Sequence, residues 1–229
     1  MVIFRSMKSV AIFSRKGGSG RTTLATHLVR LAGARDISTI AVSLDRMGDL
    51  SRWLSEGQQD THVTAIHSPS KAPRLAADAS LVVYDCPPTD KITAEIKPDL
   101  WLVPTPPASA DFLAEMLGRT LRLLTDAGGE IWVVGWRTRP GENHASVSVL
   151  RDAASAFPSA RVREQVVPES EGIYRAQDQY VGAWELPFDA GTHALAELCD
   201  DVLAHLGLVS PSTFASLARR PVTARRLVS

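Results

Sequence analysis

A glycine-rich segment near the N-terminus constrains the fold of this chain more than any other feature. After an apolar run at residues 8–14 comes the segment Arg15-Lys16-Gly17-Gly18-Ser19-Gly20-Arg21-Thr22-Thr23, and apolar residues at helical spacing follow through Ala34. A strand, a glycine-rich turn and a helix in this order are the context of a phosphate-binding loop. The glycines let successive backbone N–H groups face inward, and the helix adds the positive end of its dipole. A turn that merely joins a strand to a helix explains the spacing less well.

Further apolar runs alternate with helical patterns along the chain. Strands are predicted at residues 38–44, 81–84, 100–103 and 131–135, and helices at residues 22–34, 110–127, 145–156 and 192–206. The strand runs are continuously apolar, as in strands that are covered on both faces. The pattern therefore predicts an α/β fold, a doubly wound and mostly parallel sheet with helices on both faces.

The expected domain organisation follows from length and from the C-terminal composition. The 229 residues suit one nucleotide-binding domain over residues 1–208 and a basic, flexible tail over residues 209–229. Two prolines and four arginines mark this tail. Residues 58–73, which are polar and contain His and Pro, are predicted to form a loop or a poorly ordered connection.

Composition bears on the class of protein. Lys plus Arg equals Asp plus Glu at 25 each, which neither supports nor excludes a nucleic-acid binder, because a local basic patch is enough. Cys86 and Cys199 have no metal-ligand spacing and predict two buried thiols. No run approaches the roughly 18 apolar residues of a membrane span. Residues 1–10 do not resemble a secretory signal, so we expect a cytoplasmic protein.

The glycine-rich segment resembles the signature of the ParA/MinD group of P-loop ATPases, Lys-Gly-Gly-x-Gly-Lys-Thr-Thr. The resemblance implies that ATP is bound by Lys16, Gly17, Gly18, Ser19, Gly20, Arg21, Thr22 and Thr23. In that family a signature lysine, matched by Lys16, reaches across an ATP-sandwich dimer to the partner's phosphates. Arg21 stands in place of the ordinary lysine and offers a wider, planar fork with the same charge. Phosphate binding is expected to survive this change and hydrolysis to be slow, because phosphoryl transfer depends on positioning.

Two carboxylates follow predicted strands. Residues 43–54 resemble the family's Asp-x-Asp-Pro-Gln-Gly-Asn segment, with Asp45 as the second aspartate and Ser43 in place of the first. The resemblance gives Asp45 a catalytic role, orienting the attacking water or coupling hydrolysis to the switch. An aspartate after a strand is otherwise more often a turn or cap residue. Residues 81–88 resemble the Walker B strand, which implies that Asp85 holds Mg²⁺ through water while Thr22 offers its hydroxyl.

The C-terminal half carries softer matches. Residues 98–104 resemble a family strand with the pattern Asp-x-x-x-x-Pro, and residues 166–186 resemble the family's C-terminal segment. Pro168 lies near the position where the family packs adenine. The resemblance thus spans residues 8–208.

The resemblance implies a partition or positioning ATPase. Such proteins dimerise on ATP, bind DNA nonspecifically and release it when a partner protein stimulates hydrolysis, and their cargo is a plasmid, a chromosome or another body. The candidate DNA contacts are Arg151, Arg161, Arg163, Arg175, Arg219 and Arg220. For any one of them a solvated surface charge is the simpler explanation. A cytoplasmic or nucleoid-associated location would follow.

One alternative function remains open, and two others are disfavoured. Arg21, Ser43 and Met47, which replaces the family's Gln, favour a nucleotide-binding scaffold or regulator with little or no hydrolysis. Membrane positioning like that of MinD is disfavoured, because residues 214–220 contain only two large apolar residues and make a poor amphipathic anchor. Nitrogenase-reductase chemistry is disfavoured because neither cysteine has a cluster-binding context.

Overall fold

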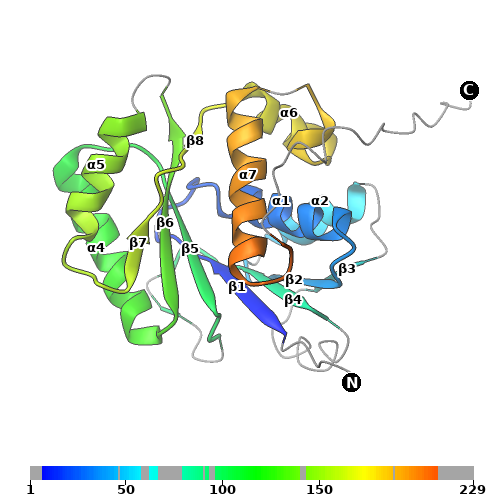
Figure 1. The fold of residues 1–229 in the computed structure, drawn as a ribbon, viewed down its shortest axis with the longest axis horizontal. Helices are drawn as coiled ribbons and strands as arrows, with labels where there is room; N and C mark the ends of the chain where they lie inside the picture. The colour runs from blue at the N-terminus through cyan, green and yellow to red at the C-terminus, as the bar shows by residue number, and fades with distance from the viewer. Residues whose placement is uncertain are drawn as a thin grey trace, which may run out of the picture.

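A parallel sheet forms the centre of the molecule (Figure 1). The structure is a computed structural model. It describes residues 7–45, 47–57, 62–66, 79–89, 91–92, 96–139, 143–187 and 189–210, without the side chains of residues 143 and 144. The strands are β1 (Lys8–Ile12), β2 (Thr39–Ser43), β3 (Val63–Ile66), β4 (Leu81–Asp85), β5 (Leu100–Thr105), β6 (Glu130–Thr138), β7 (Ala160–Val162) and β8 (Val167–Pro168). They are ordered β3-β2-β4-β1-β5-β6-β7, and β8 pairs with β6. Every pairing among them is parallel.

Helices cover both faces of this sheet. They are α1 (Arg21–Ala34), α2 (Asp49–Glu56), α4 (Ala110–Ala127), α5 (Asn143–Ala154), α6 (Glu171–Gln179) and α7 (Ala190–His205), with a short 3-10 helix η3 (Ala183–Glu185). Val10 and Ile12 of β1 pack into the core formed with α1 and α7, whereas Ala11 and Phe13 pack into the core formed with α4 and α5. Figure 1 shows these two helix layers on opposite sides of the strands. The predicted doubly wound α/β fold is confirmed.

Most predicted elements form within a few residues of their expected bounds, and α4 has the expected ones. The prediction of a loop over residues 58–73 is wrong at Val63–Ile66, which pairs with β2 as the edge strand β3. No side chain of β3 is fully buried. An edge strand of this kind does not need the continuous apolar run of the central strands, and β3 lacks one. Residues 58–61, 67–73 and 211–229 lie outside the described residues, and the domain boundary after residue 208 stays a prediction.

The central position of β1 determines where the glycine-rich segment lies. β1 pairs with β4 on one side and β5 on the other, and the register places Ile12 beside Asp85. The chain therefore leaves β1 at the carboxyl edge of the sheet, next to the end of β4. In open parallel sheets ligands bind outside this edge.

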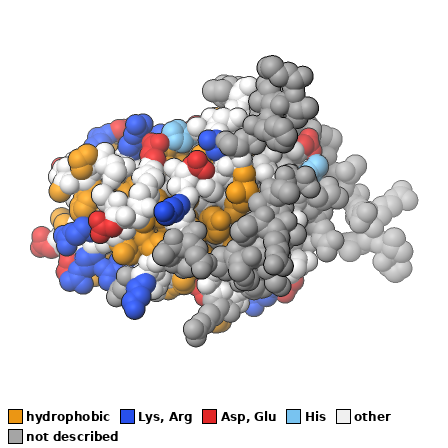
Figure 2. All heavy atoms as spheres, turned by 90° about the horizontal axis from the view of Figure 1, so that it is seen from below, with side chains coloured by type: hydrophobic (Ala, Val, Ile, Leu, Met, Phe, Trp, Pro, Cys, Tyr) orange, Lys and Arg blue, Asp and Glu red, His pale blue; other side chains and the backbone are white. Residues whose placement is uncertain are grey.

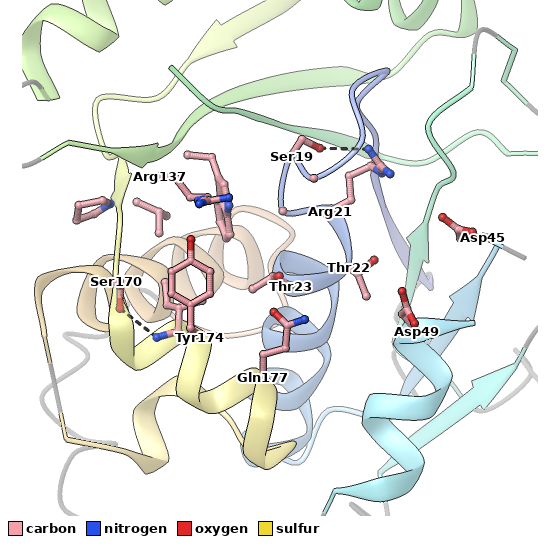
Figure 3. A pocket seen from close by; sticks show the side chains of 16 residues that line it. Ser19, Arg21, Thr22, Thr23, Asp45, Asp49, Arg137, Ser170, Tyr174 and Gln177 are labelled. Carbon is pink, nitrogen blue, oxygen red and sulfur yellow. Dashed lines mark hydrogen bonds between the residues drawn. The ribbon is translucent and has the colours of Figure 1, made fainter. Parts of the chain in front are cut away.

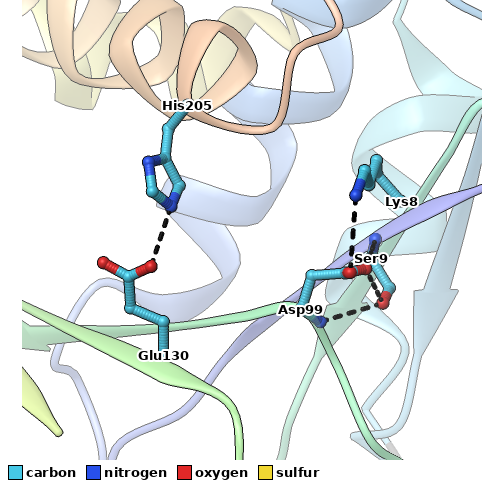
Figure 4. A network of polar contacts seen from close by, with 5 residues as sticks. All are labelled: Lys8, Ser9, Asp99, Glu130 and His205. Atoms are coloured by element: carbon cyan, nitrogen blue, oxygen red, sulfur yellow. Dashed lines mark hydrogen bonds and ion pairs between the residues drawn. The ribbon is translucent and has the colours of Figure 1, made fainter.

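Polar contacts join the elements at the opposite, amino-terminal edge (Figure 4). Asp99, just before β5, accepts hydrogen bonds from the backbone N–H of Ser9 at 2.8 Å and from its hydroxyl at 2.9 Å. Lys8 Nζ lies 3.8 Å from the same carboxylate. At the start of β6, Glu130 Oε2 lies 3.0 Å from His205 Nε2 at the end of α7. These contacts hold β1, β5, β6 and α7 together below the site.

Candidate functional site

The loop over residues 15–20 curls tightly between β1 and α1. Gly18 and Gly20 have φ angles of 68° and 91°, a left-handed backbone conformation that side chains disfavour. Gly20 is also the N-cap of α1. A Cβ atom at this position would lie 2.1 Å from the indole nitrogen of Trp136. The loop thus requires glycine at position 20 and leads directly to the positive end of a helix dipole.

A cavity of about 330 Å³ opens over the loop and the first turn of α1 (Figure 3). Among the residues expected to bind nucleotide or catalyse its hydrolysis, it is lined by Gly18, Ser19, Gly20, Arg21, Thr22, Thr23, Asp45 and Pro168. The cavity is polar beside Asp45 and Asp49, and more apolar beside Pro168 and Ile173. A cavity with both polar and apolar walls suits a ligand with a charged part and a planar part.

The structure brings Thr22 and Asp85, the two residues proposed from the sequence for Mg²⁺, together beside the loop. The Thr22 hydroxyl donates a hydrogen bond of 2.8 Å to Asp85 Oδ2. Asp85 is 1% exposed, and its Oδ1 is buried without a hydrogen-bond partner among the described residues. Burial raises the pKa of Asp85 to about 6, although the Thr22 hydroxyl and the Arg21 charge act in the opposite direction. A hydroxyl beside a carboxylate with an unsatisfied oxygen fits Mg²⁺ and its bound waters.

Asp45 lies where the chain turns from β2 toward α2. Its Oδ1 accepts a hydrogen bond of 3.1 Å from the backbone N–H of Met47, which is the turn geometry common for aspartate. Asp45 also lines the cavity, so the turn places the carboxylate at the wall. Asp49, the first residue of α2, lines the same wall. Asp49 is not predicted from the sequence, although this residue stands where the family has Asn.

Arg21 turns its guanidinium beneath the loop. Its Nε donates to the Cys86 carbonyl at 2.9 Å, and its Nη1 donates to the carbonyls of Ser14 at 2.9 Å and Lys16 at 2.5 Å. The Ser19 hydroxyl lies 3.2 Å from the same Nη1, and Figure 3 shows this contact. Arg21 is 8% exposed, and burial lowers its pKa. Three of these four hydrogen bonds therefore join main-chain segments.

Lys16 lies on the surface outside the cavity. Its Nζ is 5.7 Å from the centroid of the Phe112 ring on α4, and that side chain is 48% exposed. With these two residues, a neighbouring groove is lined by Arg15, Glu115, Met116 and Arg119. Neither Lys16 nor Gly17 lines the cavity of its own chain.

The apolar end of the cavity contains residues that sequence reasoning misses. Arg137 has a φ of 56°, rare for a residue with a side chain. Its guanidinium lies 5.4 Å from the Tyr174 ring centroid, and Glu169 accepts hydrogen bonds from Arg137 at 3.2 Å and from the Tyr174 hydroxyl at 3.3 Å. Gln177 follows Tyr174 by three residues on α6, so both face the cavity. The one available signal is the position of Arg137 at the carboxyl edge of the sheet.

The arginines predicted to contact DNA are paired with carboxylates wherever the structure describes them. The pairs are Arg151–Glu164, Arg161–Glu130 at 3.4 Å, Arg163–Asp201 at 3.0 Å and Arg175–Glu171 at 2.7 Å. Figure 2 shows basic and acidic side chains interspersed on the face seen from below. Arg219 and Arg220 lie outside the described residues. The structure therefore brings no two of the four described arginines into an unpaired basic cluster.

Two further predictions from the sequence concern the state of the cysteines and the absence of a membrane-spanning segment. Cys86 and Cys199 are free and buried, as predicted, and burial raises the pKa of both thiols. Within the described ranges, no helix has the length and apolar character needed to cross a membrane.

A family model and a known protein match most of the chain. Residues 10–206 match the family model described as the CobQ/CobB/MinD/ParA nucleotide binding domain. The maintenance of carboxysome distribution protein A of Gloeobacter kilaueensis is 28% identical over 179 residues, which cover 73% of this chain and 76% of that protein.

Solved structures show the same fold. An ATP complex of a Cyanothece McdA variant aligns with a TM-score of 0.69 and 17% identity, over 90% of this chain and 99% of that one. The septum site-determining protein MinD of Pyrococcus horikoshii, complexed with Mg-ADP, aligns with a TM-score of 0.65 and 19% identity, over 88% and 98% of the two chains.

Proposed function

The chain belongs to the CobQ/CobB/MinD/ParA nucleotide-binding domain family, and on this premise we propose that it is a ParA-like ATPase that positions a cargo in the cell. One observation carries the proposal. The Thr22 hydroxyl at the end of the glycine loop lies 2.8 Å from a buried Asp85 whose second carboxylate oxygen has no described partner. This arrangement suits a phosphate-bound Mg²⁺ better than it suits an empty fold, because a buried unsatisfied oxygen is unfavourable.

The residues around the cavity have distinct roles in this function. Backbone N–H groups over residues 17–23 bind the phosphates, and Pro168 packs against the base. Thr22 with its hydroxyl and Asp85 through water would hold Mg²⁺, and the ion would supply positive charge to neutralise the phosphates. Asp45 orients the attacking water from the cavity wall.

The assembly is a nucleotide-dependent homodimer. Lys16 is exposed and lies outside the cavity of its own chain, which supports a role across a subunit interface. In the dimer it reaches the partner's phosphates. Its contact with Phe112 involves an exposed ring, and a second subunit can replace that contact.

The proposed cargo is inferred from the relatives, and the proposed surface to which the dimer binds is nonspecific DNA. The name of the Gloeobacter relative refers to carboxysome distribution, which supports positioning of a cellular body, a plasmid or a chromosome. The paired arginines do not prevent DNA binding, because an exposed ion pair contributes only about 0–1 kcal/mol. Dimerisation doubles the number of phosphate contacts and so strengthens a weak basic surface. A partner protein then links the ATPase to its cargo and stimulates hydrolysis.

A second candidate function is a nucleotide-dependent scaffold with little hydrolysis. The position of Arg21 favours this function. Its guanidinium, which stands in place of the family's lysine, donates hydrogen bonds to three main-chain carbonyls. Measuring single-turnover hydrolysis with and without DNA separates the two candidates.

The test of the main proposal combines nucleotide titration with sedimentation. With Mg²⁺ and a non-hydrolysable ATP analogue, we expect a dimer that retains duplex DNA at low salt and loses it at high salt, whereas ADP should leave a monomer. Lys16→Ala should still bind nucleotide but fail to dimerise. Lys97→Ala, which changes an exposed lysine near the opposite sheet edge, should behave as the parent. Absence of nucleotide affinity at millimolar ATP would contradict the proposal.

A further inference from the structure

We propose that Arg21 is a positioning residue that holds the phosphate loop in its binding shape from beneath, and that it does not contact the phosphates. The inference rests on the proposed nucleotide-binding function and deepens it. Arg21 donates to Ser14 before the loop, to Lys16 within it, and to Cys86 after β4. One side chain thus joins the loop to the end of the neighbouring strand.

The shape of the guanidinium explains why arginine suits this position. Its Nε and Nη1 donate in different directions, with distances of 2.9 Å to Cys86 and 2.9 Å to Ser14. Arginine carries five N–H donors in a rigid planar fork, whereas lysine concentrates three donors on one atom. A lysine at position 21 would keep the charge but would have to reach both segments from a single nitrogen atom. The arginine therefore has a function here that charge alone does not supply.

The inward carbonyls determine where the loop amides point. In a trans peptide unit, the C=O of one residue and the N–H of the next point in opposite directions. Because Arg21 attracts the carbonyls of Ser14 and Lys16, the N–H groups of Arg15 and Gly17 face away from the guanidinium. These two fixed peptide units lead into Gly18, Ser19 and Gly20, which line the cavity. Their orientation therefore constrains the backbone whose N–H groups form the anion-binding concavity of a phosphate loop. Arg21 thus preorganises the loop before nucleotide arrives.

Movement of the Arg21 guanidinium away from these carbonyls and toward bound phosphates is unfavourable. It would leave the carbonyls of Ser14, Lys16 and Cys86 without the donors they have in this structure, and a buried acceptor without a partner is destabilising. The guanidinium also remains charged when buried, because arginine does not lose its proton. The positive charge near Asp85 and Asp45 is therefore fixed below the loop.

This link also reaches the segment that follows β4. Cys86 precedes Pro87 and Pro88, so the bond from Arg21 to the Cys86 carbonyl joins the nucleotide loop to the segment that follows the Walker B strand. A displacement of the loop or of the segment after β4 therefore acts on the other through the Arg21 side chain.

The first experiment measures hydrogen exchange of the loop amides in the full chain without nucleotide. Arg21→Lys should increase exchange over residues 15–20 by about tenfold or more, since it removes charge-assisted bonds to the loop. Arg122→Lys, on the exposed face of α4, is the matched control and should leave exchange unchanged. A contact with phosphates cannot alter the loop when no phosphate is present, so equal exchange in all three proteins would overturn the proposal.

A second measurement needs no variant and remains decisive if Arg21→Lys does not fold. In the unmutated protein the Nε–H of Arg21 should give a slowly exchanging NMR signal that persists when Mg²⁺–ATP is added to saturation. Loss or a large shift of this signal would mean that the guanidinium turns toward the phosphates, and would overturn the proposal. If titration shows that Mg²⁺–ATP does not bind at all, the proposed function fails, while the nucleotide-free exchange experiment still decides the role of Arg21.

Discussion

At the residue scale, the contact between Gly20 and Trp136 leaves no space for a side chain in the phosphate loop. Trp136 is 2% exposed at the carboxyl end of β6, and a Cβ on Gly20 would lie 2.1 and 2.3 Å from two atoms of its indole ring. The tryptophan thus supports the loop from the side of β6, and Arg21 supports it from beneath.

We expect Gly20→Ala to lower the free energy of unfolding by about 2–5 kcal/mol. A left-handed conformation costs a residue with a Cβ roughly 1–2 kcal/mol, and overpacking against the indole adds about 1–3 kcal/mol. Gly17→Ala is the matched control: a Cβ there would have no neighbour within 4 Å, so the change should stay within about 0.5 kcal/mol. Urea unfolding measures both variants, and equal losses would contradict the role assigned to Trp136.

Individual residues differ in how well their roles follow from sequence. The meeting of Thr22 and Asp85 is predictable, because both follow adjacent parallel strands that end at one edge. The direction of the Arg21 guanidinium is not, since its acceptors at Ser14 and Cys86 are 72 residues apart and are brought together only by the fold. The arginine–carboxylate pairs are likewise not predictable, because a sequence shows which residues are charged but not which of them lie close together in the fold.

At the element scale, Asp189 joins the N-termini of two helices. As the N-cap of α7, its carboxylate accepts a hydrogen bond of 2.8 Å from the Thr192 N–H, and it also accepts one of 3.1 Å from the Gly172 N–H of α6. The Ser170 hydroxyl donates to the same carboxylate at 2.8 Å. Burial alone would raise the pKa of Asp189, but these hydrogen bonds hold it below its ordinary value. The junction fixes α6, whose Tyr174 lines the cavity.

Asp189→Ala should destabilise the protein by about 1–3 kcal/mol, because it removes a cap and leaves helix N–H groups without an acceptor. We also expect weaker nucleotide binding, since α6 forms the cavity wall. Asp189→Asn keeps one acceptor oxygen and should lose less. Asp178→Ala, an exposed carboxylate on α6, is the control. Thermal unfolding and nucleotide titration on the same samples measure both effects, and a loss for Asp178→Ala equal to that for Asp189→Ala would refute the assignment.

Length and burial decide which elements sequence reasoning finds. α4 is predictable because its 18 residues carry several turns of apolar periodicity. β7 and β8 have three and two residues, too few for any period to be recognised. β3 forms because β2 offers it an unpaired edge, which is a property of the sheet and not of the segment.

At the scale of the whole molecule, a buried histidine links stability to pH. His27 on α1 is fully buried between the rings of Trp53 and Trp184, at centroid distances of 5.5 and 5.8 Å, and its Nδ1 lies 2.7 Å from the Thr23 carbonyl. Burial lowers the pKa of His27 to about 4 from 6.5. The unfolded chain therefore binds a proton between pH 6.5 and pH 4, whereas the folded chain does not. The contribution of His27 to stability is fully present above pH 6.5 and is lost as the pH falls toward 4.

The difference in unfolding free energy between the parent and His27→Gln should accordingly shrink by about 3 kcal/mol between pH 7.5 and pH 4. Taking the difference between the two proteins cancels the pH dependence that comes from the titratable groups they share. Urea unfolding at intervals of half a pH unit gives the two profiles, and above pH 7 they should run parallel. Parallel profiles down to pH 4 would show that His27 titrates normally in the folded state.

The place of β1 in the middle of the sheet also has a consequence for biosynthesis. β1 is the first described strand to leave the ribosome, yet its partners begin only at Leu81 and Leu100, and the cavity is complete only after Gln177 has been added. Pairing of strands that are distant in the chain is slow, because loop closure precedes any stabilising contact. A nascent chain therefore carries an exposed glycine loop for most of its synthesis without being able to bind nucleotide. Only chains translated past Gln177 contain every residue of the cavity wall, so shorter products lack a complete cavity.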